Sequence, residues 1–298
     1  MRFSFFYTAV PLVLASSTLA APTLQQMLGF LQQFNEDFSY PRNVEVAKSI
    51  NYTGFSEDIV GRVDVTETFI GQELNTEYIF GLFAGIATGS NASTPLLGVP
   101  VNGTLVDLVI ENNLMIATTR RDFNWTVAVV PTLWQLKFMF NDEGLVTQYD
   151  AILYRASALF ASVWPKVAKA AIKELGLPPD TSDTVAIQTR AAVDVCAAHE
   201  TYCLGPNQQY NSTKDCMDFV LRTIPLGEIW QGGQNTAVCR YVHTPMLALR
   251  PAVHCPHVGP TGGDMCFDHT YDSMIESPFT QPFNALPGNL TLAALGIA

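Results

Sequence analysis

Apolar and polar positions change their period along the first half of the chain. From Thr23 to Pro41 the apolar residues recur every three or four positions, which predicts an amphipathic helix capped by Thr23. Residues 59–70 alternate between polar and apolar and are rich in β-branched side chains, so they predict a strand. Shorter helices are predicted at residues 43–50 and 76–86.

A meander of strands is predicted between residues 104 and 150. Residues 104–110 and 114–119 are apolar runs joined at Asn112-Asn113, which favours a hairpin because asparagine tolerates a positive φ. Further strands are predicted at residues 125–130 and 133–140, and a turn at residues 142–144 precedes the last strand. Helices followed by antiparallel strands indicate an α+β domain, a curved sheet folded round a helix.

The rest of the chain is predicted to consist mostly of helices and loops. Residues 154–175 predict a helix with a break at Pro165, and residues 184–196 predict the next one. Between them, residues 176–183 contain a glycine, two prolines and capping residues, which is typical of a boundary. We therefore expect a first domain at residues 22–180, a second module at residues 184–275 and a tail at residues 276–298.

Residues 1–20 have the pattern of a secretory signal peptide. Arg2 precedes an apolar run that ends in small residues, and we expect cleavage after Ala20. The run is short and is interrupted by Pro11, which argues against a membrane anchor. Six N-glycosylation tripeptides support a secreted, extracellular glycoprotein, and we expect a fungal source. They begin at Asn51, Asn91, Asn102, Asn124, Asn211 and Asn289.

Composition and charge exclude several classes of partner. Hydrophobic residues make up 48% of the 298 residues and charged residues 14%, so we expect a substantial buried core. The net charge is −11 and the basic residues are scattered, which leaves no basic face for nucleic acid or an anionic membrane. No stretch beyond the signal peptide has the length needed to span a bilayer. Whether the chain forms a homo-oligomer is left open.

All six cysteines lie in the second module. An even number of cysteines in a secreted chain predicts three disulfides, which would stabilise a segment rich in turns. The pairing is left open, because six cysteines allow many connectivities. The residues are Cys196, Cys203, Cys216, Cys239, Cys255 and Cys266.

All five histidines lie in the same module, at residues 199–269. Neutral imidazoles that converge with nearby carboxylates would bind zinc or copper and leave one coordination position open. The alternative is that each histidine is a hydrogen-bonded structural residue, since no HExxH motif or comparable frame surrounds them. The candidate metal ligands are His199, His243, His254 and His257.

Two segments of the first domain resemble a known family. Residues 138–150, FMFNDEGLVTQYD, and residues 107–119, DLVIENNLMIATT, look like hairpins of the SnoaL-like branch of the nuclear-transport-factor-like cone fold. The resemblance covers about residues 24–155, and the Cys/His-rich module resembles no family in this way. The resemblance of the first domain implies a conical pocket, which in catalytic members of the family commonly holds an Asp–His pair or paired acids.

The chain departs from that pattern because it has no histidine before His199. An acid–base pair in the cone would have to use Asp64, Glu67, Tyr149 or Asp150, unless these are ordinary surface residues. Two functions follow as alternatives. The first is a secreted protein without classical catalysis, either a cone that binds a small apolar ligand or a structural surface component. The second is an extracellular enzyme of the cyclase, isomerase or hydrolase type that uses the histidine cluster at the mouth of the cone.

Overall fold

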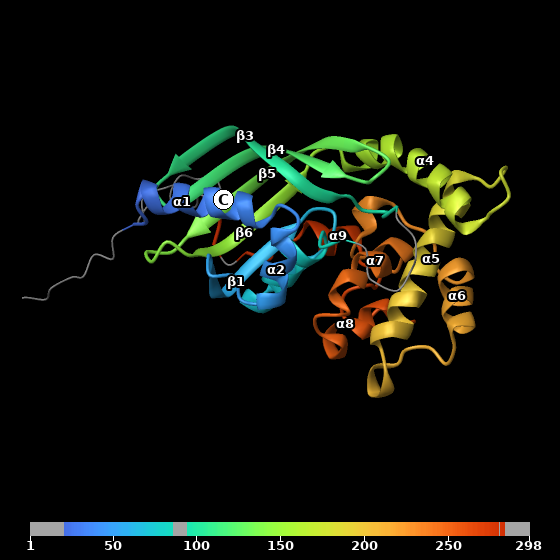
Figure 1. Cartoon of the computed structure of the whole chain (residues 1–298). Coiled ribbons are helices and arrows are strands. Elements are labelled where there is room, and N and C mark those ends of the chain that lie inside the picture. Colours follow the sequence, from blue (N-terminus) through green and yellow to red (C-terminus); the bar gives the residue numbers. More distant parts are fainter. Residues whose placement is uncertain (1–20, 86–93, 280, 284–298) are drawn as a thin grey trace, which may run out of the picture.

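The computed structural model describes residues 21–85, 94–279 and 281–283. Its first part is a six-stranded sheet in the order β2-β1-β6-β5-β4-β3, and helices make up the second part (Figure 1). The architecture is α+β, as predicted. The strands are β1 (Phe55–Val63), β2 (Thr68–Ile70), β3 (Val99–Glu111), β4 (Leu114–Asn124), β5 (Val129–Phe140) and β6 (Val146–Leu153).

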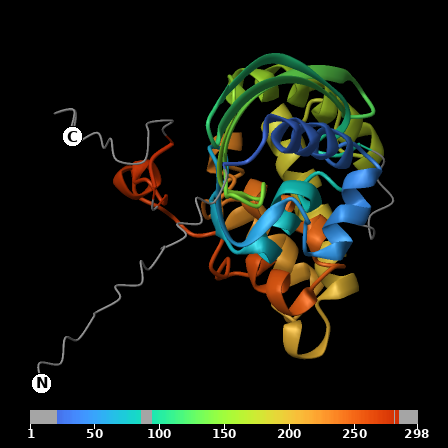
Figure 2. The same ribbon diagram turned by 90° about the vertical axis from the view of Figure 1, so that its left-hand side faces the viewer.

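The sheet curves round a single helix, α1 (Leu24–Asp37), as Figure 2 shows. Thr23 and Gln26 form a capping box that binds the free N–H groups at the start of the helix. Phe30 and Phe34 lie on its buried face, and both rings contact Phe138 of β5 edge-on. The predicted helix and its apolar face are therefore confirmed, and the fold has the curved sheet that the SnoaL-like resemblance implies.

The long strands pair antiparallel from β3 to β6, whereas β1 pairs parallel with β6. The predicted hairpin between β3 and β4 is present, and Asn112 has the positive φ of 53° that this turn requires. The predicted strand at residues 125–130 is wrong in extent, because Trp125 to Ala128 form a turn and β5 begins at Val129.

The predicted strand at residues 59–70 is two strands. β1 and β2 form a tight antiparallel hairpin, with Arg62 paired to Thr68 and residues 64–67 in the turn. The side chains of this turn do not alternate across the sheet as a continuous strand would require. This correction affects function, because Asp64 and Glu67 both lie in the turn.

The helix predicted at residues 76–86 begins earlier than expected. It consists of α3 (Gln72–Thr76) and a π-helical turn, η1 (Glu77–Gly81), so Asn75 lies inside α3 and not at its N-cap. The Asn75 amide instead donates to the carbonyls of Ile59, Phe69 and Gly71 and so ties α3 to the β1–β2 hairpin. A second short helix, α2 (Arg42–Ser49), precedes the sheet, as predicted.

The second part is mostly helical, as predicted. Pro165 lies inside α4 without ending it, in contrast to the predicted break. The helices are α4 (Ala156–Leu175), α5 (Asp183–Tyr202), η2 (Gly205–Asn207), α6 (Thr213–Arg222), η3 (Ile229–Gln231), α7 (Ala237–Val242), η4 (Thr244–Met246), α8 (Pro251–Val258) and α9 (Tyr271–Ile275). No helix of the described residues has the length and apolar character needed to cross a membrane.

Three disulfides join these helices, as predicted. They pair Cys196 with Cys216, Cys203 with Cys255, and Cys239 with Cys266. The hydrophobic core nevertheless does not divide between the two parts, since one cluster of buried side chains runs from Met27 to Met265. The helical part is therefore packed directly on the sheet part.

Candidate active site

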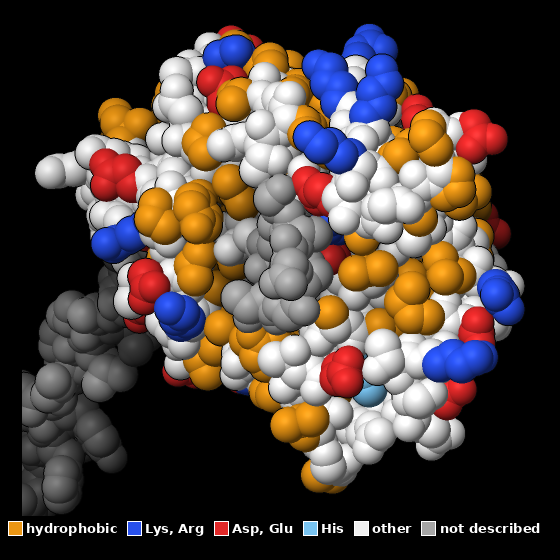
Figure 3. Space-filling view, turned by 45° about the vertical axis from the view of Figure 1, so that its right-hand side comes forward, with side chains coloured by type: hydrophobic (Ala, Val, Ile, Leu, Met, Phe, Trp, Pro, Cys, Tyr) orange, Lys and Arg blue, Asp and Glu red, His pale blue; other side chains and the backbone are white. Residues whose placement is uncertain are grey.

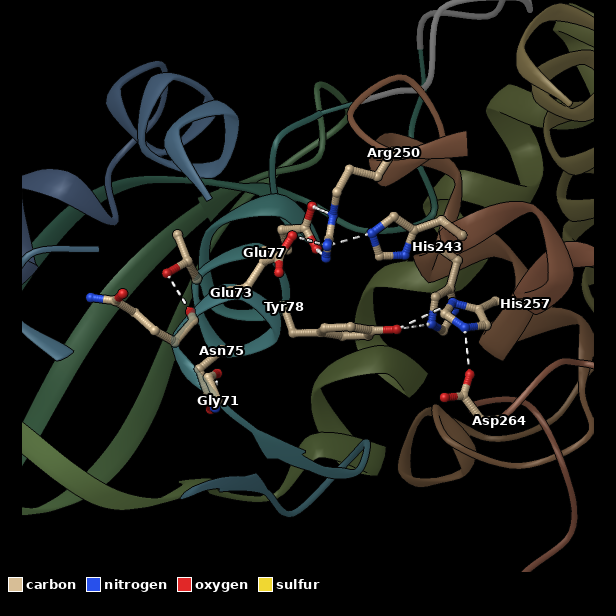
Figure 4. A network of polar contacts seen from close by, with 12 residues as sticks. Gly71, Glu73, Asn75, Glu77, Tyr78, His243, Arg250, His257 and Asp264 are labelled. Atoms are coloured by element: carbon tan, nitrogen blue, oxygen red, sulfur yellow. Dashed lines mark hydrogen bonds and ion pairs between the residues drawn. The ribbon is translucent and has the colours of Figure 1, made fainter. Parts of the chain in front are cut away.

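Three of the four candidate histidines meet at the junction between the two parts. His243 and His257 contact the hydroxyl of Tyr78, which projects from η1 (Figure 4), and the ring of His254 lies beside the rings of Tyr78 and His257. The ring centroids of His243 and His257 are 4.8 Å apart, and those of His254 and His257 are 5.4 Å apart. His199 belongs to a different region, where its Nε2 accepts a hydrogen bond from the backbone N–H of Gln209.

Hydrogen bonds fix the proton positions in this cluster. Nδ1 of His243 lies 2.7 Å from the carbonyl oxygen of Cys239, so this nitrogen must carry the proton. Nε2 of His243 is then an acceptor, and Tyr78 donates its hydroxyl proton to it across 2.9 Å. His257 lies on the other side, with Nδ1 3.3 Å from the same hydroxyl and Nε2 2.8 Å from the exposed carboxylate of Asp264. Because the carboxylate of Asp264 only accepts, Nε2 of His257 carries its ring proton, and Nδ1 of His257 is a second acceptor for the single Tyr78 proton, which the shorter contact assigns to His243.

A second group anchors the neighbouring residue, Glu77, whose side chain is fully buried. Arg250 binds both carboxylate oxygens of Glu77 and also contacts Glu73, while His254 Nε2 lies 3.1 Å from Glu77 Oε2. Burial acts to raise the pKa of Glu77, but the hydrogen bonds from His254 and Arg250 outweigh it and lower that pKa. Glu77 is thus a buried anion held by two cationic or polar partners from the helical part.

Two of these histidines, His243 and His257, are neutral near pH 7. Burial lowers the pKa of His243 well below its ordinary value, and burial together with the neighbouring His254 lowers the pKa of His257 to about 4. Burial likewise raises the pKa of the Tyr78 hydroxyl well above its ordinary value. His243 and His257 therefore act at Tyr78 as neutral hydrogen-bonding groups.

Most ring nitrogens of the cluster already have hydrogen-bond partners, and His254 Nδ1 is the exception. Among the described residues, the three candidate ligand atoms that lie within 4.8 Å of one another belong to Cys239, His243 and Cys266. The two cysteines are joined in a disulfide, so they offer no thiolate. Zinc or copper binding by His243, His254 and His257 stays a prediction.

Among the described residues, side chains pack closely around the cluster. The small void between Tyr78, His243 and Glu67 is too narrow to admit a water molecule. The cone interior next to it holds about 50 Å³, because Phe34, Phe38 and Phe83 fill most of it. A space of that size admits water and not a ring-containing ligand. A substrate therefore cannot reach the histidines in this conformation.

An open cleft lies beside the void, on the other side of the β1–β2 turn. Its volume is about 690 Å³, within the range of small-molecule sites. Asp64 and Glu67 of the turn and Asp150 of β6 line it, so three of the four predicted acidic candidates share one site. Tyr149 does not, since its side chain is fully buried in the core. The remaining walls come from Arg62, Val63, Thr66, Thr68, Ile152, Trp230, His269, Tyr271, Ser273, Met274, Ile275 and Glu276.

The two carboxyl groups of the turn have raised pKa values. Burial raises the pKa of Glu67 to about 7 and that of Asp64 to about 6, although Asp64 accepts a hydrogen bond from the backbone N–H of Leu153. Asp150 is in a different environment, where Arg62 binds both of its oxygens at 2.9 and 3.0 Å. The cleft therefore contains two carboxyl groups that can exchange a proton near neutral pH beside one fixed ion pair.

Glu67 occupies the wall between the cleft and the void at Tyr78. Its Oε1 lies 2.8 Å from Nε2 of His269, a histidine that the sequence did not single out. Gly233 makes room for this carboxylate, because a Cβ at that position would come within 2.1 Å of Oε1. Tyr78 was also missed, because no spacing in the sequence connects it with histidines that follow 165 and 179 residues later.

The chain matches two family models, the BfoA N-terminal domain at residues 32–151 and the BfoA family C-terminal domain at residues 155–269. Aurasperone B biosynthesis cluster protein A from Aspergillus niger is 38% identical over 280 residues, which cover 91% of this chain and 88% of that protein. The chain belongs to the BfoA family. Bifonsecin B biosynthesis cluster protein A from Aspergillus brasiliensis is 37% identical over 290 residues, which cover 93% of this chain and 94% of that protein.

The two BfoA models meet just before α4, between residues 151 and 155. The sequence instead predicts the boundary after this helix, at residues 176–183. Solved structures similar to this BfoA-family chain include a protein described as a SnoaL-like polyketide cyclase from Jannaschia sp. CCS1, with a TM-score of 0.34 and 10% identity. The match covers 47% of this chain and 90% of that protein.

Proposed function

We propose that this BfoA-family chain is a secreted fungal enzyme that transfers a proton on a small organic molecule bound in the cleft. The observation that carries this proposal is the pairing of two carboxyl groups of raised pKa, Asp64 and Glu67, on one open site of about 690 Å³. A carboxyl group serves best as a general acid or base when its pKa lies near the working pH.

The two acids have different roles in this proposal. Asp64 has the lower pKa and, as the anion, removes a proton from the bound molecule. Glu67 has the higher pKa, keeps its proton nearer neutral pH and returns a proton elsewhere on the molecule, which gives a reaction of the isomerase or cyclase type. Trp230 and Tyr271, which are both partly exposed, offer apolar faces to the substrate.

Secretion is supported by two kinds of observation. Three disulfides are typical of proteins that fold in an oxidising compartment. Of the six glycosylation tripeptides, those at Asn51, Asn102 and Asn211 are exposed and that at Asn124 is half-buried. The signal peptide and the tripeptides at Asn91 and Asn289 lie outside the described residues.

The names of the relatives suggest where the substrate comes from. Both belong to fungal biosynthesis clusters, so we propose an intermediate or product of such a cluster as the substrate. The cleft is the proposed binding site because the cone interior, at about 50 Å³, is too small.

The test uses purified protein and the small-molecule extract of an Aspergillus niger strain from which the related cluster protein has been deleted. Mass spectrometry follows which compounds are consumed. We expect the parent protein and the control Glu57→Gln, an exposed acid on β1 outside the cleft, to convert the same compound. Glu67→Gln should lose this activity while retaining the fold.

The result also decides between the two predicted functions. Consumption at the parent rate by Glu67→Gln removes Glu67 from the mechanism. If a compound co-purifies with the parent and is not converted at any pH, the alternative function, small-molecule binding, is favoured over catalysis.

A further inference from the structure

A second groove lies away from the cleft, between β4, β5 and the first turns of α4. Its volume is about 540 Å³, and it shares no lining residue with the cleft. Its floor is apolar, with Val130, Pro131 and Leu133 of β5 on one side and Ala158 and Leu159 of α4 on the other. Leu133 is 39% exposed, so part of its apolar surface is available to a ligand.

Cationic groups surround this apolar floor. Arg120 and Arg155 both line the groove, together with Tyr154. Arg120 contacts Asp122 at 3.2 Å, but no acidic side chain of the described residues forms an ion pair with Arg155. The groove thus has two guanidinium groups, of which only that of Arg120 has an acidic partner among the described residues, although the chain has a net charge of −11. They give the groove a charge opposite to that of the molecule as a whole.

The basic character continues along α4, so the basic residues are less scattered than the sequence predicts. Lys166, Lys169 and Lys173 are all exposed, and Lys166 lies one helical turn beyond Ser162, the last groove residue on this helix. Figure 3 shows Lys and Arg side chains gathered at the top of one face, where α4 lies. This row would attract an anion toward the groove.

The backbone at Arg155 is in an unfavourable conformation. Its φ of 55° and ψ of 39° place it in the left-handed region, which glycine adopts freely and other residues do not. Such outliers are stable only where the surroundings enforce them, and they concentrate at ligand sites. A glycine would satisfy this turn better than arginine, so the fold alone does not account for the arginine.

We propose that this groove binds an organic anion with an apolar body, such as an aromatic carboxylate or sulfonate. Arg155 and Arg120 bind the charged head group, and the apolar body lies on Leu133 and Leu159. The site is independent of the cleft and of the reaction proposed there.

The test compares two fluorescent probes that share an apolar body, 1-anilinonaphthalene-8-sulfonate and the uncharged N-phenyl-1-naphthylamine. We expect the parent to bind the sulfonate more tightly, and Arg155→Gly and Arg120→Gln each to weaken it by about fivefold, the effect of losing one partly exposed charge contact. Neither variant should change binding of the uncharged probe. Arg222→Gln, which removes an exposed arginine on α6, serves as the control and should bind both probes as the parent does.

Arg155→Gly also separates a binding role from a structural one. Because glycine relieves the left-handed backbone, this variant should melt about 2 °C higher than the parent while it loses affinity for the sulfonate. Unchanged sulfonate binding by Arg155→Gly, or an equal loss in Arg222→Gln, overturns the proposal. A lower melting temperature with unchanged affinity shows that Arg155 serves the fold.

Discussion

Glu77→Gln offers the sharpest test of how the two parts of the chain are held together. The Glu77 side chain is fully buried, and Arg250 and His254 from the helical part both bind it. Removing one member of a buried ion pair costs about 3–5 kcal/mol, because the partner loses its neutralising charge. Arg250 is 21% exposed and keeps Glu73, so we expect the lower end, about 3 kcal/mol, with a fall in Tm of about 6–12 °C for a chain of this size.

The matched control is Glu73→Gln, which removes the exposed partner of the same arginine. Its side chain is 46% exposed, so the loss should be about 0.5 kcal/mol. Urea unfolding, followed by circular dichroism, measures both variants. Equal losses for the two would refute the argument that burial makes Glu77 the anchoring anion.

The pH dependence of this difference follows from the lowered pKa of Glu77. Its carboxylate contributes stability above its unfolded pKa, near the ordinary value of 4.5, and this contribution is lost as pH falls through the lower folded pKa. The difference between the parent and Glu77→Gln should therefore be constant above about pH 5 and shrink in acid. A difference that grew on acidification would contradict the assignment.

Four further outcomes are expected. Burial raises the pKa of Glu67 from 4.5 to about 7, so this carboxyl group contributes stability below pH 4.5 that is lost as the pH rises through 7. Glu67→Gln should therefore melt at a higher temperature than the parent at pH 8 but not at pH 4. An equal difference in Tm at the two pH values would contradict this. Tyr78→Phe removes the hydroxyl shared by two imidazoles and should cost about 1–3 kcal/mol in urea unfolding. Gly233→Ala should push the Glu67 carboxylate out of place and abolish the conversion that the parent carries out; full activity would show that the carboxylate can shift harmlessly. The zinc or copper prediction requires bound metal in elemental analysis that disappears in a His254→Ala/His257→Ala variant, and metal-free parent protein excludes it.

Local periodicity was sufficient to predict most of the sheet part. The apolar positions of α1 and the Asn112-Asn113 turn follow from rules that involve near neighbours in the sequence, and both are confirmed. The turn at residues 64–67 was missed because Val65 and Thr66 favour strands, so the sequence continues to alternate through it. The turn forms because the chain reverses so that β2 can pair with β1. Local propensity cannot predict this pairing, because it depends on tertiary structure.

At the candidate site, too, some features follow from the sequence and others depend on tertiary contacts. The three disulfides could be inferred from residue type and number alone, although their pairing could not. Neither the burial of Glu77 nor the convergence on Tyr78 could be, since each depends on contacts across more than 160 residues. Of the four candidate metal ligands, His243, His254 and His257 lie together, whereas α5 places His199 beside Gln209; metal binding itself stays a prediction.

The buried contacts between the two matched domains have a consequence for how chains of this family evolve. Glu77 and Tyr78 come from one matched domain, while Arg250, His243 and His254 come from the other. A recombination event that exchanged one half between distant relatives would bring together a carboxylate and an arginine that had not been selected as a pair. The halves should therefore be inherited together, and viable chimeras should be those in which these five side chains travel as a set.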